Sequence, residues 1–149
     1  MKFSERTVPM DRRIQTVKGN GDTGSREGSM DFRIYRVIEF LKAHFGEELT
    51  EQSLADGIGM TREHFGRLFR AETGYSPMTF LRDLRFEAAR SMLEAESYPD
   101  FSVKQVAMNV GIHDMSHFVR EFEKRFGYSP RQYKNEKARI RSLGITSSQ

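Results

Sequence analysis

The sequence repeats itself, and this internal repeat constrains the fold more than any other feature. The tetrapeptide Gly-Tyr-Ser-Pro occurs at 74–77 and again at 127–130. Upstream of each copy, similar residues recur in the same order, at an offset of 52 residues that becomes 53 after Gly111. A match of this length indicates one supersecondary unit that occurs twice. The matched positions are Leu49, Thr50, Leu54, Ala55, Ile58, Gly59, Phe65, Arg67 and Phe69 in the first copy, and Phe101, Ser102, Val106, Ala107, Val110, Gly111, Phe118, Arg120 and Phe122 in the second.

Each copy has the pattern of two short helices separated by a tight turn. In the first copy Thr50 and Thr61 are favourable N-caps, and Gly59 separates the two apolar stripes that follow them. A helix-turn-helix unit needs a small residue where its helices cross, a turn residue that tolerates positive φ, and a second helix with a free outer face. We therefore expect helix-turn-helix units at about 50–74 and 102–127.

Apolar residues at helical spacing also predict helices outside the two units. The first of these helices begins at Asp31, its cap, and stops at Gly46. A linker helix covers about 77–94, because a serine and a proline at its start are a favourable cap and a favourable first helical residue. We expect an all-α chain. The apolar side of the linker helix is expected to carry Leu81, Leu84 and Ala88.

Composition excludes several classes of protein. The 149 residues contain no cysteine, so disulfides and thiolate metal sites are excluded. No apolar run approaches the roughly 18 to 20 residues of a membrane span, and the amino end lacks the pattern of a secretory signal. A nucleophile elbow, a phosphate-binding glycine loop and a pair of acid and base carboxylates are all missing. We expect a protein of the cytoplasm and nucleoid that is not an enzyme and needs no cofactor.

The outer faces of the second helix in each unit carry the candidate binding residues. Arginine can donate two hydrogen bonds to guanine, glutamate can accept one from cytosine, and methionine can pack on the thymine methyl group. These side chains therefore suit double-stranded DNA. The outer faces carry Arg62, Glu63, Gly66, Arg67 and Arg70 in the first unit, and Asp114, Met115, Ser116, His117 and Arg120 in the second.

Residues 31 to about 140 resemble the DNA-binding domain of the AraC/XylS family of bacterial transcription activators. The segments that carry the resemblance are 61–77, 84–93, 106–111 and 116–130. The resemblance implies seven helices, with two recognition helices that enter successive major-groove segments and a rigid central helix between them. It also implies RNA polymerase as a partner. The positions that match the base-reading positions of the family are Glu63, Gly66, Arg67, Met115, Ser116, His117 and Arg120.

Length and helix geometry refine this expectation. A linker helix of about 17 residues is about 25 Å long, which with its flanking turns approaches the roughly 34 Å of one DNA turn. One polypeptide can then bind an asymmetric site of about two turns as a monomer.

Residues 1–30 are polar and glycine-rich, and we expect a disordered tail or linker there, with a flexible tail at 141–149. Many family members carry a ligand-sensing domain, and we expect either a stand-alone binder or a piece of a larger protein whose upstream sensor domain is absent from this chain.

The two units differ at the cap before the second helix and at the base-reading positions. It opens with a capping box of Ser102 and Gln105, but His113 replaces the serine cap expected before its second helix. Met115 replaces a polar reader, and in the first unit Gly66 has no reading side chain and costs the helix about 1 kcal/mol against alanine. These departures leave open a second function, a protein-interaction module with weak or nonspecific DNA binding.

Other polar residues have two possible roles each. His113 and His117 have the i,i+4 spacing of metal ligands, but no third ligand is evident and no metal is expected. Glu87 and Arg90 are expected to form a solvated ion pair. The residues that either contact phosphate or are plain surface are Thr61, Arg62, Arg70, His113, Asp114, Lys134, Lys137, Arg139 and Arg141.

Overall fold

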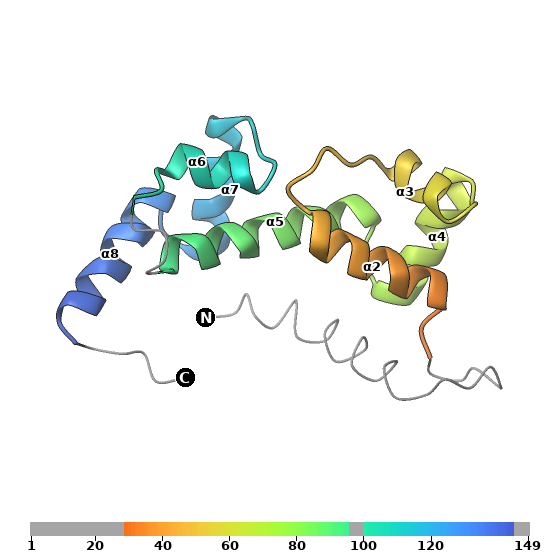
Figure 1. Cartoon of the computed structure of the whole chain (residues 1–149), viewed down its shortest axis with the longest axis horizontal. Coiled ribbons are helices and arrows are strands. Elements are labelled where there is room, and N and C mark those ends of the chain that lie inside the picture. The colour runs from red at the N-terminus through yellow and green to blue at the C-terminus, as the bar shows by residue number, and fades with distance from the viewer. Residues whose placement is uncertain (1–28, 96–99, 145–149) are drawn as a thin grey trace. The chain divides into compact units, whose positions relative to one another are not determined.

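All regular secondary structure in the described residues is helical, which confirms the expected fold class (Figure 1). The structure is a computed structural model that describes residues 29–95 and 100–144, so most of the predicted tails at 1–30 and 141–149 lies outside the described residues. Arg141 and Ser142, placed in the carboxyl-terminal tail by the sequence, instead belong to the last helix. Seven helices occur in this part of the chain. They are α2 (Phe32–His44), α3 (Glu51–Gly57), α4 (Arg62–Thr73), α5 (Pro77–Glu94), α6 (Val103–Asn109), α7 (Met115–Phe126) and α8 (Pro130–Ser142).

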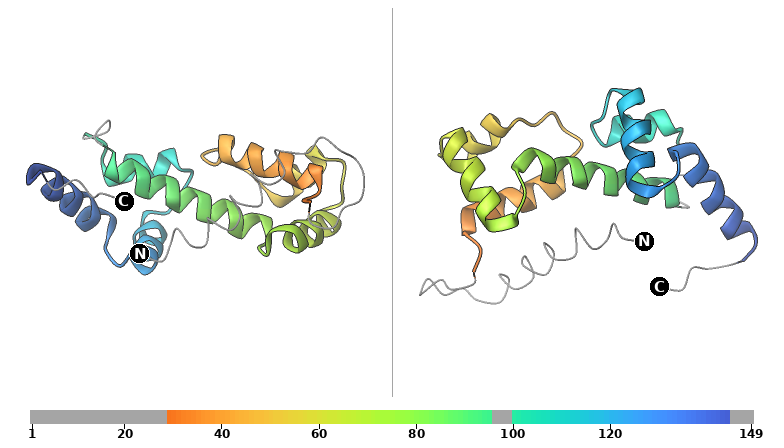
Figure 2. Two further views of the ribbon diagram at one scale, coloured as in Figure 1. Left: turned by 90° about the horizontal axis from the view of Figure 1, so that it is seen from below. Right: turned by 180° about the vertical axis from the view of Figure 1, so that it is seen from behind.

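The helices form two compact units (Figures 1 and 2). Unit 1 contains α2, α3, α4 and the beginning of α5 as far as Arg82. Unit 2 contains the rest of α5 from Asp83, together with α6, α7, α8 and the short segment Phe45–Glu48. In unit 1, α4 contacts both α2 and α3, and in unit 2, α7 contacts both α6 and α8. Each unit therefore holds one complete helix-turn-helix pair.

The helix boundaries of unit 1 follow from the predicted caps and turns. The Thr50 hydroxyl accepts a hydrogen bond from the Ser53 amide at 3.0 Å, and the Thr61 hydroxyl accepts one from the His64 amide at 3.2 Å. These bonds satisfy amides that have no partner within the helix. Gly59 in the turn adopts φ 68°, a conformation that glycine enters at little cost. The predicted helix, turn and helix are confirmed in this unit.

Unit 2 repeats this arrangement with one correction. The capping box of Ser102 and Gln105 is present. The cap of α7 is Asp114, whose carboxylate accepts from the His117 amide at 2.9 Å, so the expectation that His113 occupies the cap position was wrong. The extra residue after Gly111 moves the start of α7 by one position, and Asp114 is thus the true counterpart of Thr61 in the repeat.

Aromatic side chains form much of each core. In unit 1 the rings of Phe65, Phe69 and Phe80 meet edge to face, with centroids 5.5 to 5.7 Å apart. In unit 2 the ring of Phe86 stacks on Phe118 with centroids 5.7 Å apart. Each fully buried phenylalanine stabilises the fold by about 1.5–3 kcal/mol through removal of apolar surface from water. Because the inner faces of α4 and α7 are buried in these cores, only the outer faces of the two helices are left to contact a ligand.

The buried face of α5 differs from the prediction. Of the three expected residues Leu81 is buried, whereas Leu84 and Ala88 are half-buried. The two ends of the helix belong to different units, so α5 has two short buried faces in place of one continuous stripe. These faces comprise Pro77, Phe80 and Leu81 in unit 1, and Phe86, Ala89 and Leu93 in unit 2.

Gly46 does not end a helix in the way that the sequence suggested. Helix α2 ends at His44, and Gly46 does not have the positive φ of a glycine cap. A Cβ atom at Gly46 would lie 2.5 Å from the carbonyl oxygen of Asn109, closer than real Cβ atoms approach. Arg85 holds the same segment by donating from Nε to the Phe45 carbonyl and from Nη2 to the Glu47 carbonyl, both at 2.7 Å. Glycine is therefore needed at this position for close backbone approach.

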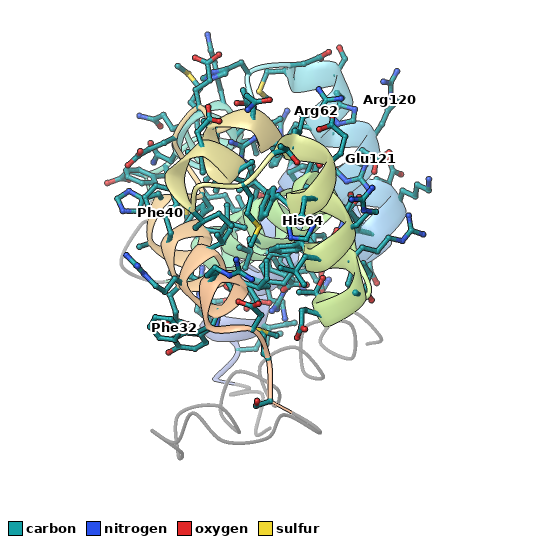
Figure 3. All side chains as sticks on the ribbon, turned by 90° about the vertical axis from the view of Figure 1, so that its right-hand side faces the viewer. Phe32, Phe40, Arg62, His64, Arg120 and Glu121 are labelled. Carbon is teal, nitrogen blue, oxygen red and sulfur yellow. The ribbon has the colours of Figure 1, made fainter. Side chains whose placement is uncertain are left out.

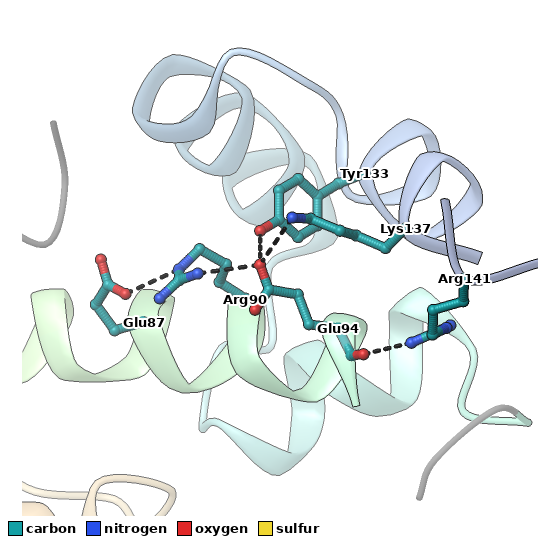
Figure 4. A network of polar contacts seen from close by, with 6 residues as sticks. All are labelled: Glu87, Arg90, Glu94, Tyr133, Lys137 and Arg141. Carbon is teal, nitrogen blue, oxygen red and sulfur yellow. Dashed lines mark hydrogen bonds and ion pairs between the residues drawn. The ribbon is translucent and has the colours of Figure 1, made fainter. Parts of the chain in front are cut away.

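A polar network joins α5 to α8 within unit 2 (Figure 4). Arg90 contacts Glu87 and Glu94, each at 3.0 Å, and the Tyr133 hydroxyl donates to the same Glu94 carboxylate. Lys137 lies 3.5 Å from that carboxylate. The predicted solvated pair of Glu87 and Arg90 is thus part of a larger, half-buried cluster.

The network changes the acid–base properties of its members. Burial raises the pKa of Tyr133 to about 12, and its hydrogen bond to Glu94 acts in the same direction. Burial alone would raise the pKa of Glu94, but the Tyr133 hydrogen bond and the charges of Arg90 and Lys137 outweigh it, so this pKa is lowered.

Candidate nucleic-acid interface

The outer face of α4 is free to bind a ligand. Its inner face carries Phe65, Phe69 and Thr73, which are buried. Residues at i, i+3, i+4 and i+7 lie on one side of a helix, so the predicted set at 63, 66, 67 and 70 forms a single surface. Gly66 is half-buried at the edge of that surface. The exposed residues of the predicted set are Thr61, Arg62, Glu63, Arg67 and Arg70.

The charged side chains of this face are not engaged by other side chains in the described part of the chain. No hydrogen bond or ion pair there involves the side chains of Arg62, Glu63, Arg67 or Arg70. Arg62 and His64 project from the first turn of α4 (Figure 3). Three arginines against one glutamate give the face a positive charge, which suits a polyanion such as DNA.

The outer face of α7 is smaller and less charged. Ser116 and Arg120 are exposed, and Arg120 extends away from the helix (Figure 3). His117 is half-buried. Met115 is also half-buried and packs against the core of unit 2, so only part of this side chain is available to a ligand. The helix therefore brings together an arginine, a hydroxyl and an imidazole.

The remaining predicted residues lie at the start of α7 and in α8. His113 is exposed, and the carboxylate of Asp114 is occupied as the N-cap of the helix. Three of the four basic residues near the carboxyl end are engaged within unit 2: Lys134 donates to the Phe101 carbonyl at 2.7 Å, and Lys137 and Arg141 contact Glu94.

A residue outside the predicted set also borders the interface. Glu51, the first residue of α3, is half-buried, and its carboxylate lies against Gly66 of α4. An ideal Cβ atom at Gly66 would be 2.6 Å from Oε1 of Glu51. Helical periodicity within α4 could not reveal this contact, because it depends on how α3 and α4 cross.

Among the described residues no three His, Cys, Asp or Glu side chains are grouped closely enough to hold a metal ion. Over the same residues no helix combines the length and the apolar character of a membrane span.

Comparisons with known proteins agree with this geometry. Residues 54–136 match a family described as a helix-turn-helix domain. The transcriptional activator RhaS of Escherichia fergusonii is 32% identical over 102 residues, which cover 68% of this chain and 36% of that protein. The transcriptional regulator CdhR of Pseudomonas aeruginosa is 34% identical over 108 residues, which cover 72% of this chain and 31% of that protein. The chain thus spans about a third of the length of these relatives.

Solved structures are similar as well. The DNA-binding domain of the global transcriptional factor AdpA, solved with a target DNA, is 28% identical with a TM-score of 0.66, and the match covers 76% of this chain and 96% of that one. The C-terminal domain of AraT, a response regulator from Geobacillus stearothermophilus, is 26% identical with a TM-score of 0.64, covering 72% and 87%. From the family match, the two units and these similarities together, we conclude that the chain belongs to the AraC/XylS family of transcription regulators and carries its DNA-binding domain.

Proposed function

We propose that this chain is a sequence-specific DNA-binding activator that reads two adjacent major-groove segments of an asymmetric promoter site. One observation supports this above all. Arg67 and Arg120 occupy equivalent positions in the repeat, both are exposed, and neither has a partner among the described residues. An ordinary surface arginine has no reason to recur in this way, whereas an arginine that donates two hydrogen bonds to a guanine does.

The other residues divide into two roles. We assign base reading to Glu63 and Arg67 on α4 and to Ser116, His117 and Arg120 on α7, with Met115 offering a small apolar contact. Gly66 contributes no side chain of its own. Contacts to phosphate are assigned to residues at the helix starts and flanks, where an amide or a cation meets the backbone of the duplex. These residues are Thr61, Arg62, Arg70, His113 and Asp114.

Two units on one polypeptide allow a monomer to bind without a palindromic site. The RhaS proteins are named transcriptional activators, and by analogy we propose activation with RNA polymerase as the protein partner. Such a protein would act at promoters on the nucleoid.

Exposed aromatic residues favour a second candidate function, a protein-interaction module with weak or nonspecific DNA binding. Phe32 and Phe40 project from α2 into solvent and are 66% and 43% exposed (Figure 3). They are about two helical turns apart on the same helix. Together they present a small apolar surface that DNA reading does not use.

Selection from random duplexes, followed by salt titration, separates the two functions. A specific regulator should enrich one asymmetric sequence and bind it about 10³-fold or more tightly than random DNA, with both affinities falling steeply as salt rises. Equal affinity for all duplexes would reject the proposed function and leave the interaction module.

A further inference from the structure

The carboxylate of Glu51 occupies the space that a side chain at position 66 would need. Oε1 of Glu51 is 2.6 Å from the ideal Cβ position of Gly66, a separation that real Cβ atoms essentially never show. Glu51 opens α3, and α3 contacts α4 within unit 1. The absence of a side chain at Gly66 and the position of this carboxylate are therefore matched to each other.

The second copy of the repeat uses the same pair of positions differently. Glu51 corresponds to Val103 and Gly66 corresponds to Val119. Both valines are half-buried and pack against the core of unit 2, so in the second copy the two side chains contribute to core packing. In unit 1 the pair places an anionic oxygen where the second unit has hydrocarbon, and that carboxylate makes no hydrogen bond or ion pair among the described residues. Core packing does not account for it.

The carboxylate also lies at the edge of the outer face of α4. Gly66 is three residues from Glu63 and four from Arg70, and residues at these spacings are neighbours on a helix surface. A hydrogen-bond partner for Glu51 would have to come from outside the described residues and approach this edge of α4. On DNA, the exocyclic amino groups of cytosine and adenine are such donors in the major groove.

We infer that Glu51 supplies the base-reading group that α4 lacks at Gly66, an inference that rests on the proposed function. The carboxylate accepts a hydrogen bond from the amino group of cytosine or adenine at one base pair. It also disfavours bases that present only acceptors there, namely the O6 and N7 atoms of guanine and the O4 atom of thymine, because two acceptors facing each other leave both unsatisfied. Specificity at this base pair thus comes from α3, through the gap that glycine leaves in α4.

The test compares four proteins by selection from random duplexes and by affinity for the selected site. Glu51→Gln keeps the shape but replaces one acceptor with a donor. Gly66→Ala adds a Cβ atom that must displace the carboxylate, and alanine favours the helix, so this variant should fold at least as well as the wild type. Glu48→Gln removes the same charge from an exposed residue three positions before Glu51 and serves as the control.

We expect Glu51→Gln and Gly66→Ala to lose about ten-fold of discrimination at one and the same base pair, with preferences elsewhere in the site unchanged. Glu48→Gln should keep the full wild-type preference. If Glu51→Gln changes affinity for every duplex equally, as Glu48→Gln does, the carboxylate acts as a plain charge and the inference is overturned. If only Gly66→Ala changes the preference, the helix backbone is the reader and the inference is again overturned. Failure of the wild type to enrich any sequence rejects the proposed function and this inference with it, which distinguishes the two failures.

Discussion

Arg125 of α7 places Nη1 2.7 Å from Oδ1 of Asp83 on α5, and its guanidinium lies 4.6 Å from the centre of the Phe86 ring. The two charged side chains are only 14% and 15% exposed. Nε of Arg125 is buried without a hydrogen bond, and the Glu121 carboxylate lies 4.0 Å from it. The buried cation in unit 2 therefore depends on Asp83 for its compensation.

Removal of that compensation should destabilise the domain strongly. Asp83→Ala leaves an unpaired, largely buried guanidinium, and we expect a loss of about 3 kcal/mol in the free energy of unfolding, measured by urea denaturation. The double variant Asp83→Ala with Arg125→Met should recover much of this loss, because methionine removes the charge and still packs on Phe86. A loss below about 1 kcal/mol for Asp83→Ala would show that the pair is effectively solvated.

Tyr133 should make the stability of the domain sensitive to alkaline pH. Its pKa is raised from 10.0 to about 12 in the folded chain, so the contribution of its protonated form is fully present below pH 10 and is lost as pH rises through 12. Tyr133→Phe keeps the ring on Phe122 but removes the hydroxyl that donates to Glu94, which should cost about 1 kcal/mol at neutral pH.

The measurement is the difference in unfolding free energy between wild type and Tyr133→Phe from pH 8 to 12. The comparison removes the effect of lysine deprotonation, which both proteins share. The difference should shrink between pH 10 and 12. A constant difference over this range would contradict the assignment of the raised pKa to the Tyr133 hydroxyl.

Arg67 and Arg120 should each specify particular base pairs. Both arginines are exposed, so neither Arg67→Ala nor Arg120→Ala should change the free energy of unfolding by more than about 0.5 kcal/mol. On the selected site each variant should lose roughly 1 to 3 kcal/mol of binding free energy, and the loss should be confined to different base pairs for the two arginines. Equal losses on every duplex would assign both residues to phosphate contacts.

Two glycine substitutions should have opposite effects on stability. Gly46→Ala brings a Cβ atom to 2.5 Å from the Asn109 carbonyl oxygen, and we expect a destabilisation of about 1–3 kcal/mol as the backbone shifts. Gly57→Ala is the matched control, because nothing lies within 4 Å of its Cβ position at the end of α3. It should be neutral or stabilising by up to about 1 kcal/mol. Thermal unfolding of the two variants checks the prediction.

Features that depend on neighbouring residues could be predicted from the sequence. The caps at Thr50 and Thr61 and the turn at Gly59 were confirmed, because a capping bond spans three residues and a positive φ is a property of one. The outer face of α4 could be predicted for the same reason, since helical periodicity is a local property.

Features that depend on distant segments could not be predicted. Glu94 and Tyr133 are 39 residues apart, and nothing near either residue in the sequence indicates their hydrogen bond. The place of Gly46 against Asn109 and of Glu51 against Gly66 likewise depends on tertiary packing. A signal for the Glu51 contact was present in the repeat, where a charged residue and a glycine take the positions of two valines.

The two buried faces of α5 extend the repeat beyond the helix-turn-helix pairs. At the offset of 52 residues, Ile34, Val37 and Leu41 of α2 correspond to Phe86, Ala89 and Leu93 of α5, and all six are buried. Pro77 and Phe80, at the other end of α5, correspond to Pro130 and Tyr133 of α8. Helix α5 is thus the last helix of one copy and the first helix of the next. The junction between the two copies of the repeat falls inside a helix, and no single cut can release two intact copies, because any cut in or around α5 leaves one copy with an uncovered apolar surface.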